Sequence, residues 1–216
     1  MNDSAWRPGL QRGLAALGLA GEVEFAERLI RYLELLETWN RKFNLTAVRD
    51  PAEMVPRHIL DSLALGPHLP PGRVLDVGTG AGLPGIPLAL RYPERNFTLL
   101  DSNGKKTRFV NQAVLMLGIG NVEVVKERVE RYRPASGFEI IVSRAFASLA
   151  DFVTGTRHLL APGGHWLAMK GVYPEDEIVA LPVGVELRAA HRLRVPGLTG
   201  ERHLLELRDT RAAGTD

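Results

Sequence analysis

Apolar residues recur at three- and four-residue steps near the start of the chain. Between Glu22 and Trp39 they are Val23, Ala26, Ile30, Leu33, Leu36 and Trp39. This spacing puts their side chains on one face, so it predicts an amphipathic helix over 22–39 that Asn40 and Arg41 end. The whole region of about 9–66 has this helical character.

A second helix is predicted to begin at Asp50 and Pro51. Asp accepts hydrogen bonds at a helix N-cap, Pro suits the first helical position, and Glu53 follows three residues after the cap. The apolar residues that continue the helical spacing are Met54, Val55, Ile59, Leu60, Leu63 and Ala64. The intervening segment 43–46 is too short and too polar for a core strand. Because 67–72 is rich in proline, we predict a boundary there.

After residue 72 the period of the apolar pattern changes. Short apolar runs predict buried strands at 73–77, 97–101, 122–125, 138–142 and 165–169. Helical patterns lie among them at 83–91, 105–117 and 147–160, the last one stopped by Pro162-Gly163-Gly164. This alternation indicates an α/β fold with a mostly parallel, doubly wound sheet.

The last part of the chain has a different pattern. The runs at 185–195 and 202–207 have no helix between them, so they predict an antiparallel hairpin that closes the edge of a seven-stranded sheet. We therefore predict three parts. They are a helical N-terminal extension over 1–71 packed on the core, an α/β core over 72–210, and a flexible tail over 211–216.

Composition narrows the class of protein. The 216 residues are 45% hydrophobic with a net charge of +2, so the chain can bury a core and is not disordered. No run of about 18 apolar residues predicts a membrane-spanning helix, and the first residues lack the apolar stretch of a secretion signal. The absence of cysteine excludes disulfides and cysteine nucleophiles. We expect a cytoplasmic protein with no membrane partner and no metal site.

Charge is unevenly distributed along the chain. Residues 73–150 hold 11 Lys and Arg against 7 Asp and Glu, whereas 1–72 and 151–216 each hold 8 against 9. A mildly basic centre suits an acidic partner without requiring one.

A glycine-rich loop follows the first predicted strand. Gly78, Gly80 and Gly82 alternate after Asp76, at the point where a strand gives way to a helix. Glycines there allow a sharp turn and a close approach of the backbone to a ligand. No Lys-Ser/Thr pair follows, which argues against a nucleoside-triphosphate loop. A carboxylate at the strand end suits a cationic ligand such as S-adenosylmethionine (SAM) better than a pyrophosphate.

Asp101 ends the second predicted strand, twenty-three residues after Gly78. A carboxylate there can accept both hydroxyls of a ribose, which suits SAM and NAD equally. Because the stretch from Gly80 to Gly85 also satisfies G-x-G-x-x-G, an NAD-dependent oxidoreductase stays open as an alternative. A non-catalytic RNA-binding protein built on a methyltransferase fold is a second alternative.

Four segments in this order carry a resemblance to a known family. They are FNLTAVRDPAEMVPRHILDSL, VLDVGTGAGLPGIPLAL, LLDSNGKKTRFV and IIVSRAFASLADF. Over about residues 25–171 the chain resembles RsmG, also called GidB, the bacterial 16S ribosomal RNA guanine-N7 methyltransferase family. The resemblance implies a class I SAM-dependent methyltransferase (Rossmann-like) fold with a helical N-terminal extension.

The same resemblance implies a substrate. It is a guanine in the conserved loop of the decoding region of 16S rRNA. The form of the substrate stays open between the free RNA, the small ribosomal subunit and an assembly intermediate of it. We expect the protein to act as a monomer.

The resemblance also implies cofactor contacts. They fall on Gly78 and Leu83 in the loop, on Val129 and Glu130 after the third strand, and on Arg144 after the fourth. By the general pattern of the class, Asp76 acts near the methionine end and Asp101 on the ribose, while Gly80 and Gly82 complete the loop. Arg144 and Phe146 are the candidates for a catalytic role, and an ion pair or core packing is the structural alternative for each.

The residues available agree with methylation of guanine N7. Pyrimidine C5 methylation generally uses a cysteine, and methylation of exocyclic amines usually uses an Asn/Asp-Pro-Pro-aromatic motif where this chain has Ser143-Arg144-Ala145-Phe146. Guanine N7 carries a lone pair and no proton, so its methylation needs in-line placement rather than a base. Candidate RNA contacts are Asn44, Arg57, His58, Lys105, Lys106, Arg108 and Lys170, together with Thr46.

Overall fold

The computed structural model describes residues 3–144 and 146–211. The tail predicted for 211–216 therefore lies outside the described residues, apart from Arg211. In the described part of the chain no helix is long and apolar enough to span a membrane.

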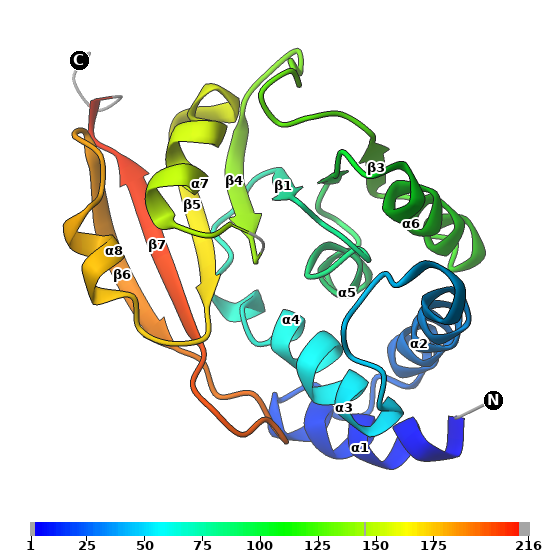
Figure 1. Cartoon of the computed structure of the whole chain (residues 1–216). Helices are drawn as coiled ribbons and strands as arrows, with labels where there is room; N and C mark the ends of the chain where they lie inside the picture. The colour runs from blue at the N-terminus through cyan, green and yellow to red at the C-terminus, as the bar shows by residue number, and fades with distance from the viewer. Residues whose placement is uncertain (1–2, 145, 212–216) are drawn as a thin grey trace.

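A seven-stranded sheet forms the centre of the molecule, in the order β3-β2-β1-β4-β5-β7-β6 (Figure 1). The strands are β1 Val74–Val77, β2 Phe97–Leu100, β3 Val122–Val125, β4 Phe138–Ser143, β5 Leu160–Lys170, β6 Val185–Arg192 and β7 His203–Asp209. Strands β1 to β5 are parallel, and β7 runs antiparallel to both β5 and β6. The predicted parallel sheet with a C-terminal antiparallel hairpin is confirmed.

Helices cover both faces of this sheet. They are α1 Asp3–Ala16, α2 Val23–Phe43, α3 Pro51–Met54, the π-helix η1 Val55–Leu60, α4 Asp61–Leu63, η2 Gly66–His68, α5 Gly85–Arg91, α6 Gly104–Met116, α7 Leu149–Thr156, η3 Arg157–Leu159 and α8 Glu175–Val179. Asp50 caps α3 as predicted, because its carboxylate accepts the Ala52 N–H over 2.9 Å.

The two faces carry separate hydrophobic cores. On one face, β-strand side chains such as Leu99 and Val142 pack with α5, α6 and the N-terminal helices. On the other face, Ile141 and Trp166 pack with α7 and η3. The N-terminal helices lie beside the end of the sheet where β4 and β5 finish (Figure 1), so they can contribute side chains to a site at that end.

Some expected details are wrong. Val23 is 70% exposed, because it lies at the first residue of α2. Ile30, Leu33 and Leu36 are buried as the spacing predicts, and Phe25, Leu29 and Tyr32 extend the buried face. The helix also continues to Phe43, where Asn44 ends it with a left-handed φ of 49°.

The last of the predicted helices, over 147–160, also ends at a different residue. Helix α7 ends at Thr156 and β5 begins at Leu160, five residues before the predicted strand. Pro162-Gly163-Gly164 lies within β5, where the pairing with β4 shifts register between Phe138 and Ile140. The proline and glycines thus form an irregularity inside a strand instead of a stop. The short helix α8 had no counterpart in the prediction.

Candidate cofactor and substrate site

The Asp76 carboxylate holds the glycine loop in place by hydrogen bonds. Its side chain is fully buried, and its Oδ2 accepts hydrogen bonds from the Thr79 hydroxyl over 2.7 Å and from the Gly85 N–H over 2.9 Å. Burial raises the pKa of this carboxyl to about 6. Asp76 thus holds the loop through Oδ2, whereas its buried Oδ1 has no hydrogen-bond partner among the described residues.

Gly80 and Gly82 both have a positive φ, of 61° and 85°. A side chain at the two positions would have different surroundings. A Cβ on Gly82 would lie 2.5 Å from Ile86 Cδ1, so a side chain there would have to displace Ile86 of α5. A Cβ on Gly80 would meet no atom closer than the Gly78 carbonyl oxygen at 3.9 Å. The loop therefore leaves open space above Gly80 for a close ligand.

Asp101 lies next to this loop at the end of β2 and is 8% exposed. Its Oδ2 accepts the Gly80 N–H over 2.9 Å, and its Oδ1 accepts the Asn103 N–H over 2.8 Å. The N-cap of α6 is Asn103, which accepts from Lys105 N. Asp101 is thus not a helix cap, and its carboxylate is held at the mouth of the loop.

Two cavities meet at Gly78, which lines both. The smaller cavity, of about 200 Å³, is lined by Val77, Gly78, Leu100, Asp101, Ser102, Glu127, Arg128, Val129, Glu130 and Phe146. The larger, of about 440 Å³, is lined by Leu45, Thr46, Val48, Arg57, His58, Asp61, Gly78, Thr79, Gly80, Ala81, Leu83, Arg144, Met169, Lys170, Gly171 and Arg202. We call them the acidic cavity and the basic cavity.

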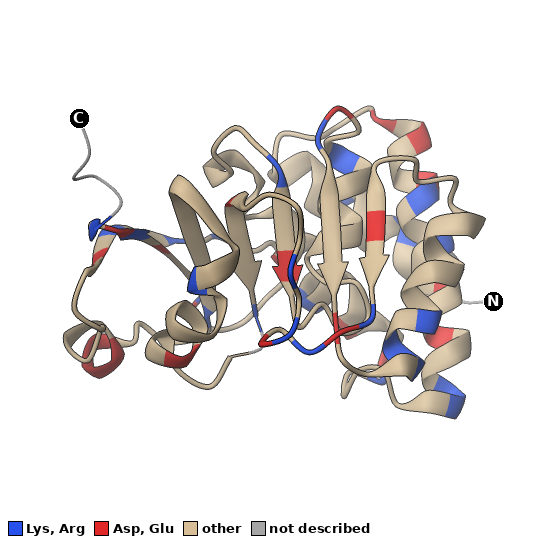
Figure 2. Cartoon of the chain, turned by 90° about the horizontal axis from the view of Figure 1, so that it is seen from above, with Lys and Arg blue, Asp and Glu red and all other residues tan. Residues whose placement is uncertain are grey.

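The two cavities differ in charge. Asp101, Glu127 and Glu130 outnumber Arg128 in the acidic cavity. Four cationic side chains face a single carboxylate among the described residues that line the basic cavity. Charged residues of both signs alternate along the loop that follows β3 (Figure 2). An acidic pocket joined to a basic one can hold a cationic nucleoside beside a polyanion.

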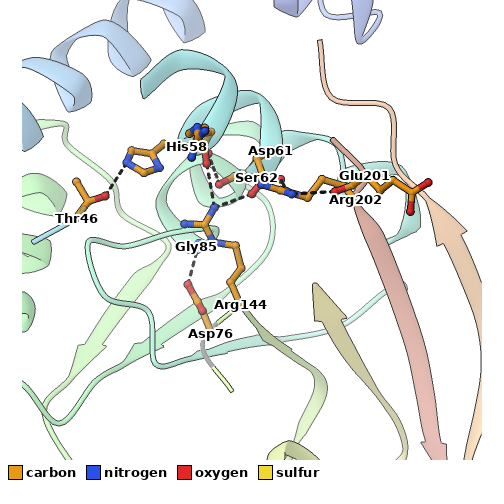
Figure 3. Close-up of polar contacts among 10 residues, drawn as sticks. Thr46, His58, Asp61, Ser62, Asp76, Gly85, Arg144, Glu201 and Arg202 are labelled. Atoms are coloured by element: carbon orange, nitrogen blue, oxygen red, sulfur yellow. Dashed lines mark hydrogen bonds and ion pairs between the residues drawn. The ribbon is translucent and has the colours of Figure 1, made fainter. Parts of the chain in front are cut away.

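Arg144 lies in the basic cavity at the end of β4. Its Nη1 donates to Asp61 Oδ2 over 2.8 Å and to the Arg57 carbonyl over 3.3 Å (Figure 3). Arg202, from the connection between β6 and β7, donates its Nε to Asp61 Oδ1 over 3.0 Å. Sequence reasoning assigned no role to either residue. Asp61 lies inside one of the four family segments, and Arg202 lies outside all of them, 141 positions later.

His58 joins the same cavity from η1. Its Nε2 lies 3.0 Å from the Thr46 hydroxyl, and that hydroxyl accepts the Val48 N–H over 3.2 Å. Burial and the nearby Arg144 guanidinium lower the pKa of His58 to about 4. The imidazole is therefore neutral at pH 7 and contributes a hydrogen-bonding group rather than a charge.

The other predicted site residues do not share one location in the structure. Phe146 lines the acidic cavity, with its ring 5.2 Å from Phe152, so it lies with the cofactor candidates and not beside Arg144. Lys170 lines the basic cavity but is bound to Glu177 over 2.8 Å. Asn44 lies outside both cavities and accepts from Arg49.

The cations at the start of α6 also lie outside both cavities. Lys105 and Arg108 are exposed, and Lys106 Nζ lies 4.0 Å from the Asp101 carboxylate. They form a positively charged rim next to the loop rather than part of either cavity wall.

A glycine loop after β1, a carboxylate after β2 and the order 3-2-1-4-5-7-6 together define a class I SAM-dependent methyltransferase. Solved structures share this fold. The glycopeptide N-methyltransferase MtfA complexed with S-adenosyl-L-homocysteine (SAH) aligns with a TM-score of 0.59 at 11% identity, over 69% of this chain and 86% of that one. TrmN from Thermus thermophilus aligns with a TM-score of 0.54 at 23% identity, over 79% and 53%.

The sequence comparisons define the family. The GidB family, rRNA small subunit methyltransferase G, matches residues 26–205, and the chain belongs to it. The ribosomal RNA small subunit methyltransferase G of Pseudomonas paraeruginosa is 56% identical over 93% of this chain and 94% of its own length. The protein of the same description from Laribacter hongkongensis is 54% identical over 92% and 96%. The chain is thus an enzyme, and the alternatives of an oxidoreductase and of a non-catalytic binding protein are set aside.

Proposed function

We propose that this enzyme transfers the methyl group of SAM to N7 of a guanine in 16S rRNA of the small ribosomal subunit. The observation that carries the proposal is the meeting of an acidic and a basic cavity at Gly78. A cationic cofactor on one side and an RNA loop on the other would bring their reacting atoms together above the glycine loop.

The acidic cavity and the glycine loop supply the cofactor contacts in this proposal. Asp101 accepts the ribose hydroxyls, while Val129, Glu130 and Phe146 enclose the base. Gly78, Gly80 and Leu83 let the backbone approach the methionine part, with Gly82 and Asp76 holding the loop in shape. Arg144 lines the basic cavity, as Gly80 and Leu83 do.

Methyl transfer to guanine N7 mainly requires the protein to position the two reactants. When bound, SAM supplies a methyl group on a positively charged sulfur. The N7 lone pair forms the new carbon–nitrogen bond as the carbon–sulfur bond breaks, and sulfur keeps the electron pair. No proton moves, so the neutral His58 and the ion-paired Arg144 act by positioning rather than as a base.

The basic cavity and its rim receive the RNA in this proposal. Thr46, Arg57, His58 and Lys170 line the cavity, and Lys105, Lys106 and Arg108 add positive charge on α6. The Lys and Arg side chains among these residues bind phosphates without reading sequence. A guanine taken out of its stack would reach the cofactor between these groups.

We place the enzyme in the cytoplasm as a monomer, with 1–71 acting as an extension of a 72–210 core. The extension supplies Asp61 and His58 to the basic cavity, which supports a functional unit made of both parts. Analytical ultracentrifugation with and without SAH tests the oligomeric state.

A labelled-methyl transfer assay tests the function. Labelled SAM is offered with small subunits, assembly intermediates, protein-free 16S rRNA, tRNA and bulk protein from cells lacking this gene. Chemical cleavage at 7-methylguanine then locates the label. We expect label at one small-subunit guanine. Label on tRNA or protein instead, or label in 16S rRNA without cleavage, would contradict the proposal.

A further inference from the structure

Three segments that are distant in the sequence meet at one buried carboxylate in the basic cavity. Asp61 lies where η1 passes into α4, and its side chain is 5% exposed. Arg144 and Arg202 bind its two oxygens separately, one to each (Figure 3). The carboxylate thus joins the N-terminal extension, the centre of the sheet and the C-terminal hairpin.

This cluster carries more positive charge than its carboxylate balances. Two guanidinium groups share one Asp61, which leaves one positive charge in excess. The other cations of the cavity are already paired, Lys170 with Glu177 and Arg57 with Glu53. The excess charge of the basic cavity is therefore concentrated at Arg144 and Arg202.

Arg202 keeps hydrogen-bonding capacity beyond these contacts. Its Nε is bound to Asp61 and its Nη1 to the Glu201 carbonyl over 2.8 Å. Within the described residues its Nη2 has no bonding partner. The side chain is 28% exposed and lines the cavity, so an anion there would meet a partly desolvated guanidinium. Planar guanidinium groups suit phosphate oxygens particularly well.

We propose that Arg202, held by Asp61 opposite Arg144, binds a backbone phosphate of the substrate RNA, with Asp61 as its positioning residue. The inference rests on the proposed function and names a contact within it. It assigns roles to Asp61 and Arg202, which lie outside the glycine loop, and to the connection between β6 and β7.

The first test compares two arginines of the same hairpin. Arg202→Gln removes the proposed phosphate contact. Arg192→Gln is the matched control, because Arg192 makes an ion pair with Glu201 over 3.0 Å, its side chain is 71% exposed and it does not line the cavity. Binding of protein-free 16S rRNA is measured by filter binding with SAH present, from low to high salt. SAH affinity is measured separately by calorimetry.

We expect Arg202→Gln to weaken rRNA binding about tenfold and to reduce the slope of log affinity against log salt by about 1. Arg192→Gln should leave both values as in the wild type, and SAH affinity should be unchanged in both variants. Equal effects of the two substitutions would overturn the proposal in favour of general electrostatics. A loss of SAH affinity equal to the loss of rRNA affinity would overturn it by assigning the anion to the cofactor carboxylate.

The second test asks whether Asp61 acts through Arg202. Asp61→Asn keeps the shape of the side chain and removes the charge that holds both arginines. We expect it to lower kcat/KM for 16S rRNA about tenfold in the wild type and at most about threefold in Arg202→Gln, because the two residues act together. Thermal melts show whether each variant is folded. The same loss in both backgrounds would show that Asp61 does not act through Arg202 and would overturn its role as the positioning residue of that side chain.

The assay of the wild type separates this inference from the proposed function. If the wild type methylates no guanine of 16S rRNA, the proposed function fails. If the wild type methylates a guanine of 16S rRNA and Arg202→Gln retains the wild-type salt slope, only the phosphate contact fails.

Discussion

The backbone N–H of Gly80 donates to the Asp101 carboxylate over 2.9 Å, which ties the loop after β1 to the end of β2. The hydrogen bond brings the most open point of the loop to the carboxylate that faces the acidic cavity. A ligand bound there would contact both residues at once. Substitutions at these two positions should therefore affect cofactor binding before they affect folding.

Gly80→Ala tests the open space above the loop. The new methyl group would meet no protein atom closely, so the expected result is a loss of SAH affinity of at least tenfold from occupation of the ligand space. Adding a Cβ at positive φ also destabilises the fold by about 1 kcal/mol. Calorimetric titration with SAH measures the affinity.

A matched control exists for this substitution. Gly118 has the same φ of 61° and nothing within 4 Å of its Cβ position, but it follows α6 and lines neither cavity. Gly118→Ala should cost similar stability and leave SAH affinity intact. If both variants lose affinity equally, backbone strain rather than ligand space explains Gly80.

Asp101→Ala should nearly abolish methyl transfer while the protein still folds. The variant loses the acceptor for the ribose hydroxyls, and hydrogen bonds to a charged group contribute about 1.5–3 kcal/mol each. We expect SAH affinity to fall roughly 100-fold or more by that measure. Transfer at the wild-type rate would contradict the role given to this carboxylate.

Tyr32→Phe tests how the N-terminal extension supports the loop. The buried Tyr32 hydroxyl of α2 donates to the Ala81 carbonyl over 2.7 Å. Without it this carbonyl loses its partner, which costs about 1–3 kcal/mol of unfolding free energy. We expect a lower urea midpoint and a several-fold weaker SAH affinity, because Ala81 adjoins Gly80. Tyr173→Phe, at an exposed position, should change neither.

His58 should make the protein sensitive to mild acid. Its pKa is lowered from 6.5 to about 4 in the folded state, so between these values the unfolded chain binds a proton that the folded protein excludes. The unfolding free energy that depends on the neutral imidazole is fully present above pH 6.5. It is lost as the pH falls towards 4, by about 3 kcal/mol in total.

Urea unfolding at several pH values checks this sign. His58→Gln should flatten the fall in unfolding free energy between pH 6.5 and 4 relative to the wild type. His158→Gln, which changes an exposed histidine, is the control and should keep the wild-type slope. A wild-type slope in His58→Gln would show that the imidazole is not kept neutral by burial.

Local features of the sequence predicted much of the fold. The Asp50 cap, the alternating glycines and Asp101 each depend on neighbours within a few residues, and their order along the chain is that of the strands. The cluster at Asp61 depends on residues from three segments. Its assembly follows from tertiary packing, for which one sequence contains no periodic signal.

The π-helical turn η1 is a further example. It places Arg57, His58 and Asp61 at the basic cavity, although its residues continue an ordinary helical spacing in the sequence. Similarly, β5 begins within a segment whose proline and glycines predict a break. In both cases tertiary contacts override a local preference.

Arg144→Ala should abolish methyl transfer with a modest loss of stability. Arg144 donates to Asp61 over 2.8 Å, and Arg202 still pairs with that carboxylate when Arg144 is removed. We therefore expect a cost of about 1.5–3 kcal/mol in unfolding free energy, the usual range for a hydrogen bond to a charged group. The rate should fall at least 100-fold, because the guanidinium lines the basic cavity, where the proposed function places the substrate guanine. Arg157→Ala is the matched control, since Arg157 binds Asp209 over 2.8 Å with a side chain 23% exposed against 24% for Arg144. It should lose similar stability and keep its activity. Single-turnover transfer to 16S rRNA at saturating SAM measures the rate, and equal rates for the two variants would show that Arg144 only holds the structure together.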